Sequence, residues 1–310
     1  MKTSAQKSSK ALHRFAFLTA VAIWLLLIAG GLVTSTDSGL AVPDWPLSYG
    51  MLFPPMVGGI FYEHGHRMIA GLVGLMILVL AIWLRRSEPR GWVRGLGYTA
   101  LGAVTLQVLL GGLTVLLLLP PEISIAHACL GQAIFCLVVS LAWCTGPGWE
   151  ARARVLQGIG STSVRAAAMV LPVLAMAQLI LGAVIRHTGR AVPLHVVGAV
   201  CLVVVAAWLG ALVVLRWRHA PFVKMHVVRF LLLLSGQVAL GVVVLNQRGS
   251  VPLRTAHVAV GALILAQSVV LVWEVIRADS SNVPSSVSGM CAISAEAGRH
   301  TYVTAQRRVE

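Results

Sequence analysis

The sequence predicts an all-α integral membrane protein whose eight transmembrane helices form two pseudo-symmetric four-helix bundles. The composition, a set of long apolar segments and an internal repeat each support this fold class. Of the 310 residues, 58% are hydrophobic and 11% are charged, and the mean hydropathy is +0.86. An ordinary soluble domain carries about 25% charged residues, so the composition excludes a soluble fold.

The apolar segments are long enough to cross a bilayer, which takes about 20 mostly apolar residues. We place eight of them at residues 15–34, 63–84, 95–119, 123–144, 166–186, 193–215, 227–246 and 255–276. The first follows a basic flank and has no small-residue cleavage site, so we expect it to remain as a helix rather than to be removed as a signal peptide. An even number of spans puts both termini on one side of the membrane.

The basic residues show which side that is. The chain has 24 Lys and Arg against 10 Asp and Glu, a net charge of +14. Most of the basic residues lie in alternate connections, namely the N-terminal segment, 85–94, 145–165, 216–229 and the C-terminal tail. Cytoplasmic loops are enriched in positive charge, so we expect both termini in the cytoplasm. The net positive charge is then explained by the basic loops on the cytoplasmic side of a lipid bilayer, and no nucleic-acid partner is expected. The start lacks a long Arg- and Ser-rich transit peptide, which favours a bacterial cell membrane.

The two halves of the chain repeat each other. Residues 107–131 align without a gap to 237–261, and 30–36 align more loosely to 182–188. Each repeat holds an even number of helices, so both have the same orientation in the membrane. We divide the chain into an N-terminal cytoplasmic segment (1–14), a first bundle (15–144) with an outer loop (37–62), a cytoplasmic linker (145–165), a second bundle (166–276) and a flexible cytoplasmic tail (277–310).

Four histidines occupy repeat-related places near the outer ends of the second, fourth, sixth and eighth helices: His66, His127, His195 and His257. The residue four positions later is always small: Ala70, Gly131, Ala199 and Gly261. An unpaired polar group in hydrocarbon is costly, so each ring needs a partner. A hydrogen bond between helices is one explanation; a metal ligand is the other. Structural zinc takes four ligands, whereas two imidazoles per bundle suit the axial ligation of a haem.

The first half alone has an acidic residue beside its histidine. Glu63 lies three residues before His66 and therefore on the same helix face, whereas the sequence before His195 has no acid. Glu63 is a candidate catalytic acid, base or charge stabiliser; the alternative is an ion pair with Arg67. Arg67, Arg190 and Arg254 lie near the histidines and are candidate partners for haem propionates.

The proline- and aromatic-rich loop after the first helix also belongs to the first half only. Residues 34–55 read T-S-T-D-S-G-L-A-V-P-D-W-P-L-S-Y-G-M-L-F-P-P. Such a loop can form part of an interfacial aromatic belt or cover a substrate pocket. The asymmetry between the halves suggests that the second half holds a redox haem and that chemistry takes place on a haem in the first half.

At these residues the chain resembles the haem A synthase family, whose eukaryotic members assist cytochrome oxidase assembly. The matching motifs are G-G-L-V-T-S-T-D-S-G-L at 30–40, P-D-W-P-L at 43–47, E-H-G-H-R at 63–67, A-H-A-C-L-G at 126–131, R-H-T-G at 186–189, P-L-H at 193–195 and A-H-V-A-V-G at 256–261. The resemblance covers residues 15–276. The chain departs from it in having no Cys pair in the first outer loop and T-D-S-G at 36–39 where T-G-S-G is usual.

The resemblance implies a function for each histidine pair. His195 and His257 would hold a permanent haem b. His66 and His127 would bind the substrate haem O, with Glu63 needed to oxidise its C8 methyl group to the formyl group of haem A. It further implies haem O supplied by a haem O synthase, and electrons leaving through the haem b half to an acceptor, for which a quinone is one candidate.

Two other functions remain open on the sequence. A di-haem b-type electron carrier would use the same four histidines but would not need Glu63 or the loop. A transporter built from parallel repeats would need more polar groups at mid-membrane than Gln107, Gln178 and Gln237. The Leu- and Val-rich outer surfaces also permit a homo-oligomer.

Overall fold

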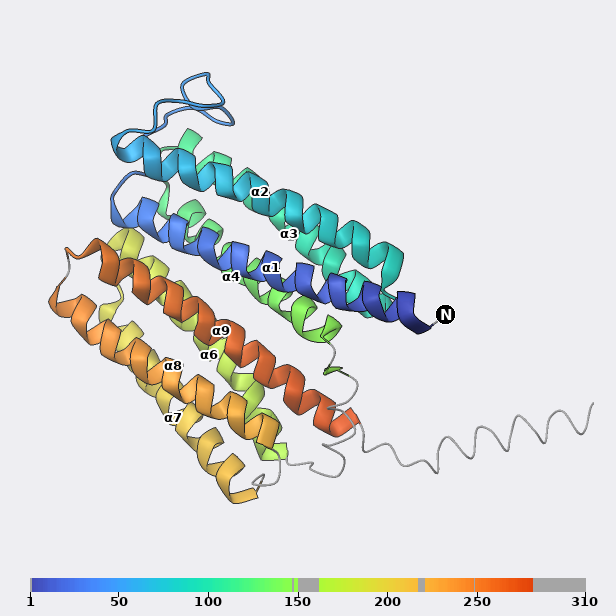
Figure 1. Ribbon diagram of the computed structural model, residues 1–310. Helices are drawn as coiled ribbons and strands as arrows, with labels where there is room; N and C mark the ends of the chain where they lie inside the picture. Colours follow the sequence, from blue (N-terminus) through green and yellow to red (C-terminus); the bar gives the residue numbers. More distant parts are fainter. Residues whose placement is uncertain (1, 147, 150–161, 217–220, 248, 281–310) are drawn as a thin grey trace, which may run out of the picture.

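The computed structural model describes residues 2–146, 148–149, 162–216, 221–247 and 249–280 (Figure 1). Within these residues the chain forms eight helices, each long and apolar enough to cross a membrane. They are α1 (Lys2–Ser35), α2 (Gly58–Ser87), α3 (Gly91–Leu116), α4 (Pro121–Thr145), α6 (Thr162–Thr188), α7 (Val192–Arg216), α8 (Pro221–Asn246) and α9 (Val251–Ser280). The predicted all-α fold with eight spans is confirmed.

Several predicted boundaries move. Helix α2 begins at Gly58, so the first outer connection is 36–57 and not 37–62. Helix α3 ends at Leu116, short of the predicted 119, because Leu118 and Leu119 take positive φ angles of 60° that a helix does not allow.

The connections at the other end move as well. Residues 221–226, predicted to lie in the connection before the seventh span, belong to α8, and 277–280 of the predicted tail continue α9. Residues 281–310 of that tail and most of the predicted linker, 150–161, lie outside the described residues.

The helices form two bundles of the same design, seen side by side in Figure 1. In the first, α1 packs on α2 and α4, and α3 packs on α2 and α4; in the second, α6, α7, α8 and α9 repeat this cycle in the same order. The bundles meet where α1 contacts α9, α4 contacts α6 and α4 contacts α9. Helix α1 corresponds to α6, and α4 corresponds to α9. Exchanging the halves therefore turns the α1–α9 contact into the α4–α6 contact and leaves the α4–α9 contact unchanged, as a twofold axis along the helices would.

Hydrogen bonds across this interface supplement the apolar packing. Each half has its own buried core of aliphatic side chains, and Ala262 and Ala266 of α9 join the core of the first half. Hydrogen bonds between membrane helices contribute about 0.6 kcal/mol each on average. Bonds across the interface include those that join Trp24 to Ala259 (3.1 Å), Arg254 to Ser35 (2.8 Å), Trp273 to Ser140 (2.9 Å) and Trp143 to Glu274 (3.1 Å).

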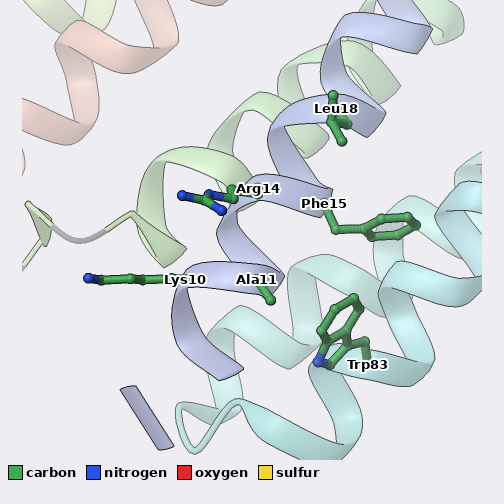
Figure 2. A pocket seen from close by; sticks show the side chains of 6 residues that line it. All are labelled: Lys10, Ala11, Arg14, Phe15, Leu18 and Trp83. Atoms are coloured by element: carbon green, nitrogen blue, oxygen red, sulfur yellow. The ribbon is translucent and has the colours of Figure 1, made fainter. Parts of the chain in front are cut away.

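We call the end of the molecule that carries the connection 36–57 the loop end, and the opposite end, where α1 begins, the terminal end (Figure 1). A surface hollow lies at the terminal end, between α1 and α2, and is lined by Lys10, Ala11, Arg14, Phe15, Leu18 and Trp83 (Figure 2). Phe15 and Trp83 face each other across it, with ring centroids 5.7 Å apart. Gly30 lies roughly 24 Å further along α1 than Arg14, at 1.5 Å per residue, so this hollow is remote from the four histidines.

Candidate functional site

Each of the four repeat-related histidines packs against a glycine of the preceding helix. A methyl group added at Gly30, Gly111 or Gly241 would lie 3.1–3.2 Å from the ring carbon Cε1 of the histidine that it faces, which is closer than ordinary contact. One added at Gly182 would lie 3.7 Å from the same atom. The pairs are Gly30 with His66, Gly111 with His127, Gly182 with His195, and Gly241 with His257. The missing side chain therefore leaves the space in which each imidazole lies.

The two histidines of a bundle come from helices on opposite sides of it. Helices α2 and α4 do not pack directly on each other within the described structure, and neither do α7 and α9. The histidines extend from these diagonal helices at the loop end, and all four are partly buried. The centre of each bundle therefore has one imidazole on either side.

The spacing of the second pair suits a shared metal. The ring centroids of His195 and His257 are 6.4 Å apart, and their planes are inclined by 61°. Bonds of about 2 Å from one metal ion to two opposite imidazoles separate the two nitrogens by about 4 Å and the ring centres by on the order of 6 Å. His66 and His127, which extend from the diagonal helices α2 and α4, are the corresponding pair of the first bundle.

The ring nitrogens provide a second test of whether a haem fits. The Nδ1 atoms of His66, His127 and His257 are buried without a hydrogen-bond partner in the described part of the chain. Leaving a buried polar atom unsatisfied costs about 1–3 kcal/mol, so these rings are suited to a further partner. Among the described residues no group of three or more His, Cys, Asp or Glu could hold a metal ion. Opposed pairs fit the axial ligation of two haems better than they fit structural zinc sites.

Glu63 and Arg67 attach the connection 36–57 to the start of α2. The two side chains form an ion pair, with Arg67 Nη2 2.6 Å from Glu63 Oε1. The other oxygen of Glu63 accepts a hydrogen bond from the backbone N–H of Val42 at 2.8 Å. The guanidinium of Arg67 also donates to the carbonyls of Asp44, Leu47 and Val42, at 2.7, 2.9 and 3.2 Å.

The predicted pairing of Glu63 with Arg67 is thus present, and Glu63 is buried, with 4% of its surface exposed. Its role in catalysis stays a prediction, as does a propionate contact by Arg67, whose guanidinium already binds the loop.

Two further contacts dock the loop, and sequence reasoning missed both. His64, two residues from His66, is buried, and its Nδ1 lies 2.8 Å from the hydroxyl of Ser48. The indole of Trp45 lies on α3 at Gly112, where an added methyl group would be 2.8 Å from the ring. The Y-E-H-G-H-R run at the very start of a helix was the available signal, because polar residues there can face the preceding loop.

Asp44 organises the loop internally. Its carboxylate accepts hydrogen bonds from the backbone N–H groups of Gly50, at 2.8 Å, and Tyr49, at 2.6 Å. These two bonds, and to a smaller extent the positive charge of Arg67, hold the pKa of Asp44 below its ordinary value of 3.8. Residues 36–57 therefore form a folded segment, which we call the cap.

The second half has no equivalent cap. Helices α6 and α7 are joined by residues 189–191 alone, and Arg190 in this connection is exposed. Arg254 donates to the carbonyl of Ser35 at 2.8 Å, and Arg186 pairs with Asp37 at 3.0 Å, so both arginines join the second half to the first. Propionate binding by Arg190 and Arg254 stays a prediction.

His226 is a further residue that the sequence did not single out. It was expected in a cytoplasmic segment, but it lies in α8, 2% exposed, with its ring edge against Trp143 at 5.1 Å between centroids. Its Nδ1 is 2.9 Å from the amide nitrogen of Gln267. It lies toward the terminal end, remote from the four paired histidines, and its contacts support the packing of the two bundles.

Parts of the chain are similar to known proteins. Residues 56–194 match the family model described as cytochrome oxidase assembly protein. The chain is 36% identical over 111 residues to the haem A synthase of Bacillus licheniformis, covering 34% of this chain and 36% of that one. It is 44% identical over 77 residues to the haem A synthase of an Exiguobacterium species, covering 24% and 25%. The matches support the haem A synthase family.

The matched region is informative about the first half above all. It contains Glu63, His66, Arg67 and His127, and it ends one residue before His195. The alignments to the curated relatives span about a third of those proteins, or less. A further match is 35% identical over 128 residues to a protoheme IX farnesyltransferase of Haloarcula marismortui, covering 40% of this chain and 27% of that one. The ligand pair of the second half therefore rests on the internal repeat and on the geometry.

Proposed function

We propose that this protein is a haem A synthase, an oxidoreductase that converts the C8 methyl group of haem O to the formyl group of haem A for cytochrome oxidase. One observation carries the proposal. Two bundles of the same design each direct a pair of histidines at their centre, and only the first has a folded cap and a buried acid beside its pair. The named relatives, which are haem A synthases, support the same function.

The two pairs take different groups in this proposal. His195 and His257 hold a permanent haem b, and His66 and His127 hold haem O. The iron of each haem supplies the electron-transfer chemistry. Glu63, one turn before His66, provides a fixed negative charge that stabilises positive charge developing on the substrate, and its pairing with Arg67 holds that charge in position. The cap of residues 36–57 limits access of water to the first bundle.

The overall reaction balances with water as the source of oxygen. A methyl group and one water molecule give a formyl group, four protons and four electrons. The electrons leave through the second half to an acceptor of the quinone class, and a haem O synthase supplies the substrate. The similarity to a protoheme IX farnesyltransferase is consistent with a place in haem modification.

The test is to identify the haems that the full-length protein carries and forms. We would produce it with a haem O synthase in cells that make no haem A, and analyse the extracted haems by mass spectrometry. The proposal requires haem b together with haem A, and loss of the formylated product in His66→Ala. Haem b in both halves without any formylated product would instead establish the alternative, a di-haem b-type electron carrier.

We also propose that both termini face the cytoplasm and that the histidine pairs lie toward the outer face. Lys10 and Arg14, which lie at the terminal end (Figure 2), follow the preference of basic residues for the cytoplasmic side. Phe53 in the cap is 78% exposed, so Phe53→Cys provides a labelling site. A membrane-impermeant maleimide should label it in intact spheroplasts; labelling only after lysis would reverse the orientation.

A further inference from the structure

Three glutamines within the membrane-spanning helices occupy equivalent places beside the histidine pairs. Each lies four residues before the glycine that receives a histidine ring, and therefore on the same helix face. The pairs are Gln107 with Gly111, Gln178 with Gly182, and Gln237 with Gly241. One helix face thus contacts each of these histidines twice, through the glycine at the ring and through the glutamine one turn away.

Each glutamine donates a hydrogen bond to the backbone carbonyl of its histidine. The amide nitrogen of Gln107 is 3.0 Å from the carbonyl oxygen of His127, and that of Gln237 is 2.9 Å from that of His257. The side chain of Gln178 is oriented so that its amide oxygen accepts a hydrogen bond from the backbone N–H of Ala199. Its amide nitrogen then donates to the carbonyl of His195 at 2.9 Å. A carbonyl oxygen has two lone pairs, so these bonds add to the helical hydrogen bond and join the ligand-bearing residue to the neighbouring helix.

The amides also approach two of the imidazoles. The amide nitrogen of Gln107 lies 3.4 Å from Nε2 of His127, and that of Gln178 lies 3.1 Å from Nδ1 of His195. In a haem-bound histidine one ring nitrogen binds iron and the other carries a hydrogen, so the bond to the backbone carbonyl is the contact by which a glutamine restrains the ligand.

The fourth histidine lacks this restraint. The residue four positions before Gly30 is Leu26, whose aliphatic side chain has no hydrogen to donate and packs against the core of the first half. Among the described residues, His66 therefore has the glycine contact, at 3.2 Å, and the nearby backbone of Leu26, but no side-chain amide bonded to its own carbonyl. In the first bundle, a glutamine bonds to only one of the two histidines. In the second bundle, a glutamine bonds to each of them.

We propose that Gln107, Gln178 and Gln237 are positioning residues for the histidine ligands, and that Leu26 makes His66 the weakly held ligand through which haem in the first half exchanges. This inference rests on the proposed function and deepens it. A substrate haem must enter and its product must leave, whereas a permanent cofactor must stay. The distribution of the glutamines matches that division.

The experiment measures how fast each haem leaves. The full-length protein carrying haem in both halves is mixed with an excess of apomyoglobin, and the transfer of haem is followed in the Soret band. We expect a fast phase from the first half and a slow phase from the second. Gln237→Met, which keeps the length of the side chain but removes the donor, should accelerate the slow phase by about three- to tenfold, the effect of losing one hydrogen bond.

Leu26→Gln is the more demanding variant, because it should add the missing hydrogen bond. We expect it to slow the fast phase by about three- to tenfold, whereas Leu26→Met, which has no donor, should leave this phase unchanged. Gln267→Met is a matched control on α9, since Gln267 contacts His226, which is not a proposed ligand, in the same manner. It should leave both phases unchanged.

A second readout separates positioning from packing. The low-spin electron paramagnetic resonance signal of the second-half haem depends on the orientation of its two imidazoles, so Gln237→Met should shift it. If Gln237→Met lowers only the unfolding temperature and leaves the signal and the slow phase as they were, the glutamines merely pack helices. If Leu26→Gln does not slow the fast phase, the exchange role of His66 is wrong. If the unaltered protein holds no haem in either half, the proposed function itself fails.

Discussion

The two halves share a scaffold and differ at one end. Both have the same cycle of helix contacts, and both place a histidine against a glycine twice. At the loop end, however, the connection between the first two helices is 22 residues long in the first half, numbers 36–57, and three residues long in the second, numbers 189–191. The comparison teaches that the repeated part of the chain builds the two histidine pairs, while the unrepeated part gives only the first pair a folded cap.

The cap of the first half is attached by charge as well as by packing. Glu63, Arg67 and His64 lie in the first turns of α2 and bind the loop through its backbone and through Ser48. The corresponding start of α7 has only apolar residues before His195. An ion pair of low exposure is costly to bury, and among the described residues only the first half has one at the loop end.

The largest effect should come from removing one ligand of the second pair. His257→Ala leaves His195 without its opposed partner and should reduce the haem content from about two to about one per chain, because axial ligation needs both imidazoles. His127→Ala should remove the haem of the first half instead. Extracted haems counted against protein distinguish the two variants. Loss of both haems in either variant would show that the halves do not bind haem independently.

The next largest effect concerns the acid that only the first half has. Glu63→Ala should abolish haem O oxidation while both halves still fill with haem. It also leaves the charge of Arg67 unpaired, at 16% exposure, and should lower the free energy of unfolding by about 2–3 kcal/mol, less than for a fully buried pair. Product formation, haem content and a denaturation curve are measured together.

Glu63→Gln is the companion variant, since its amide oxygen can still accept from Val42. Because the amide carries no charge, Arg67 stays unpaired, and we expect this variant to restore only the part of the stability that comes from the Val42 bond, without restoring turnover. Loss of haem from the first half in Glu63→Ala would instead make the residue structural.

The helices and their grouping into two bundles could be predicted from the sequence because hydropathy and the internal repeat are properties of the chain itself. The positions of His66, His127, His195 and His257 followed from the same repeat, since equivalent residues in a duplicated bundle face equivalent neighbours. Their opposition across each bundle required knowing which helices are diagonal, and that is a property of the packing.

What could not be predicted depends on contacts between distant segments. His64 is two residues from His66 and so faces away from it, but the sequence does not reveal that the loop folds back onto this second face. His226 was assigned to a loop because charged residues surround it, whereas its own side of α8 packs against Trp143. The glutamines were noted only as rare polar groups, because a bond to a backbone carbonyl on another helix leaves no periodic pattern.

A smaller effect should follow from disturbing the place where the cap rests. In Gly112→Ala the new methyl group would lie 2.8 Å from the indole of Trp45, so the ring or the helix must move. Overpacking of this kind costs about 1–3 kcal/mol. We expect faster proteolysis of the cap and a change in tryptophan fluorescence, with the haem of the second half unaffected.

Gly102→Ala in the same helix is the matched control. No other atom lies within 4 Å of the methyl group that it adds, and alanine favours a helix by up to about 1 kcal/mol over glycine. It should leave proteolysis of the cap unchanged and keep or raise stability. Equal effects of the two substitutions would show that Trp45 does not rest on Gly112.

The smallest effect should be a loosening of the cap in acid. The N–H groups of Gly50 and Tyr49 favour the charged form of Asp44 and lower its pKa below 3.8. A carboxyl whose pKa is lower when folded stabilises the folded form above its unfolded pKa, and this contribution disappears as the pH falls through the folded pKa. Tryptophan fluorescence should therefore report loosening below about pH 4. Asp44→Asn should shift the baseline at neutral pH and reduce the acid transition. The second half, which has no cap, should retain its haem over the same range, so a parallel loss of both haems would attribute the transition to the bundles rather than to the loop.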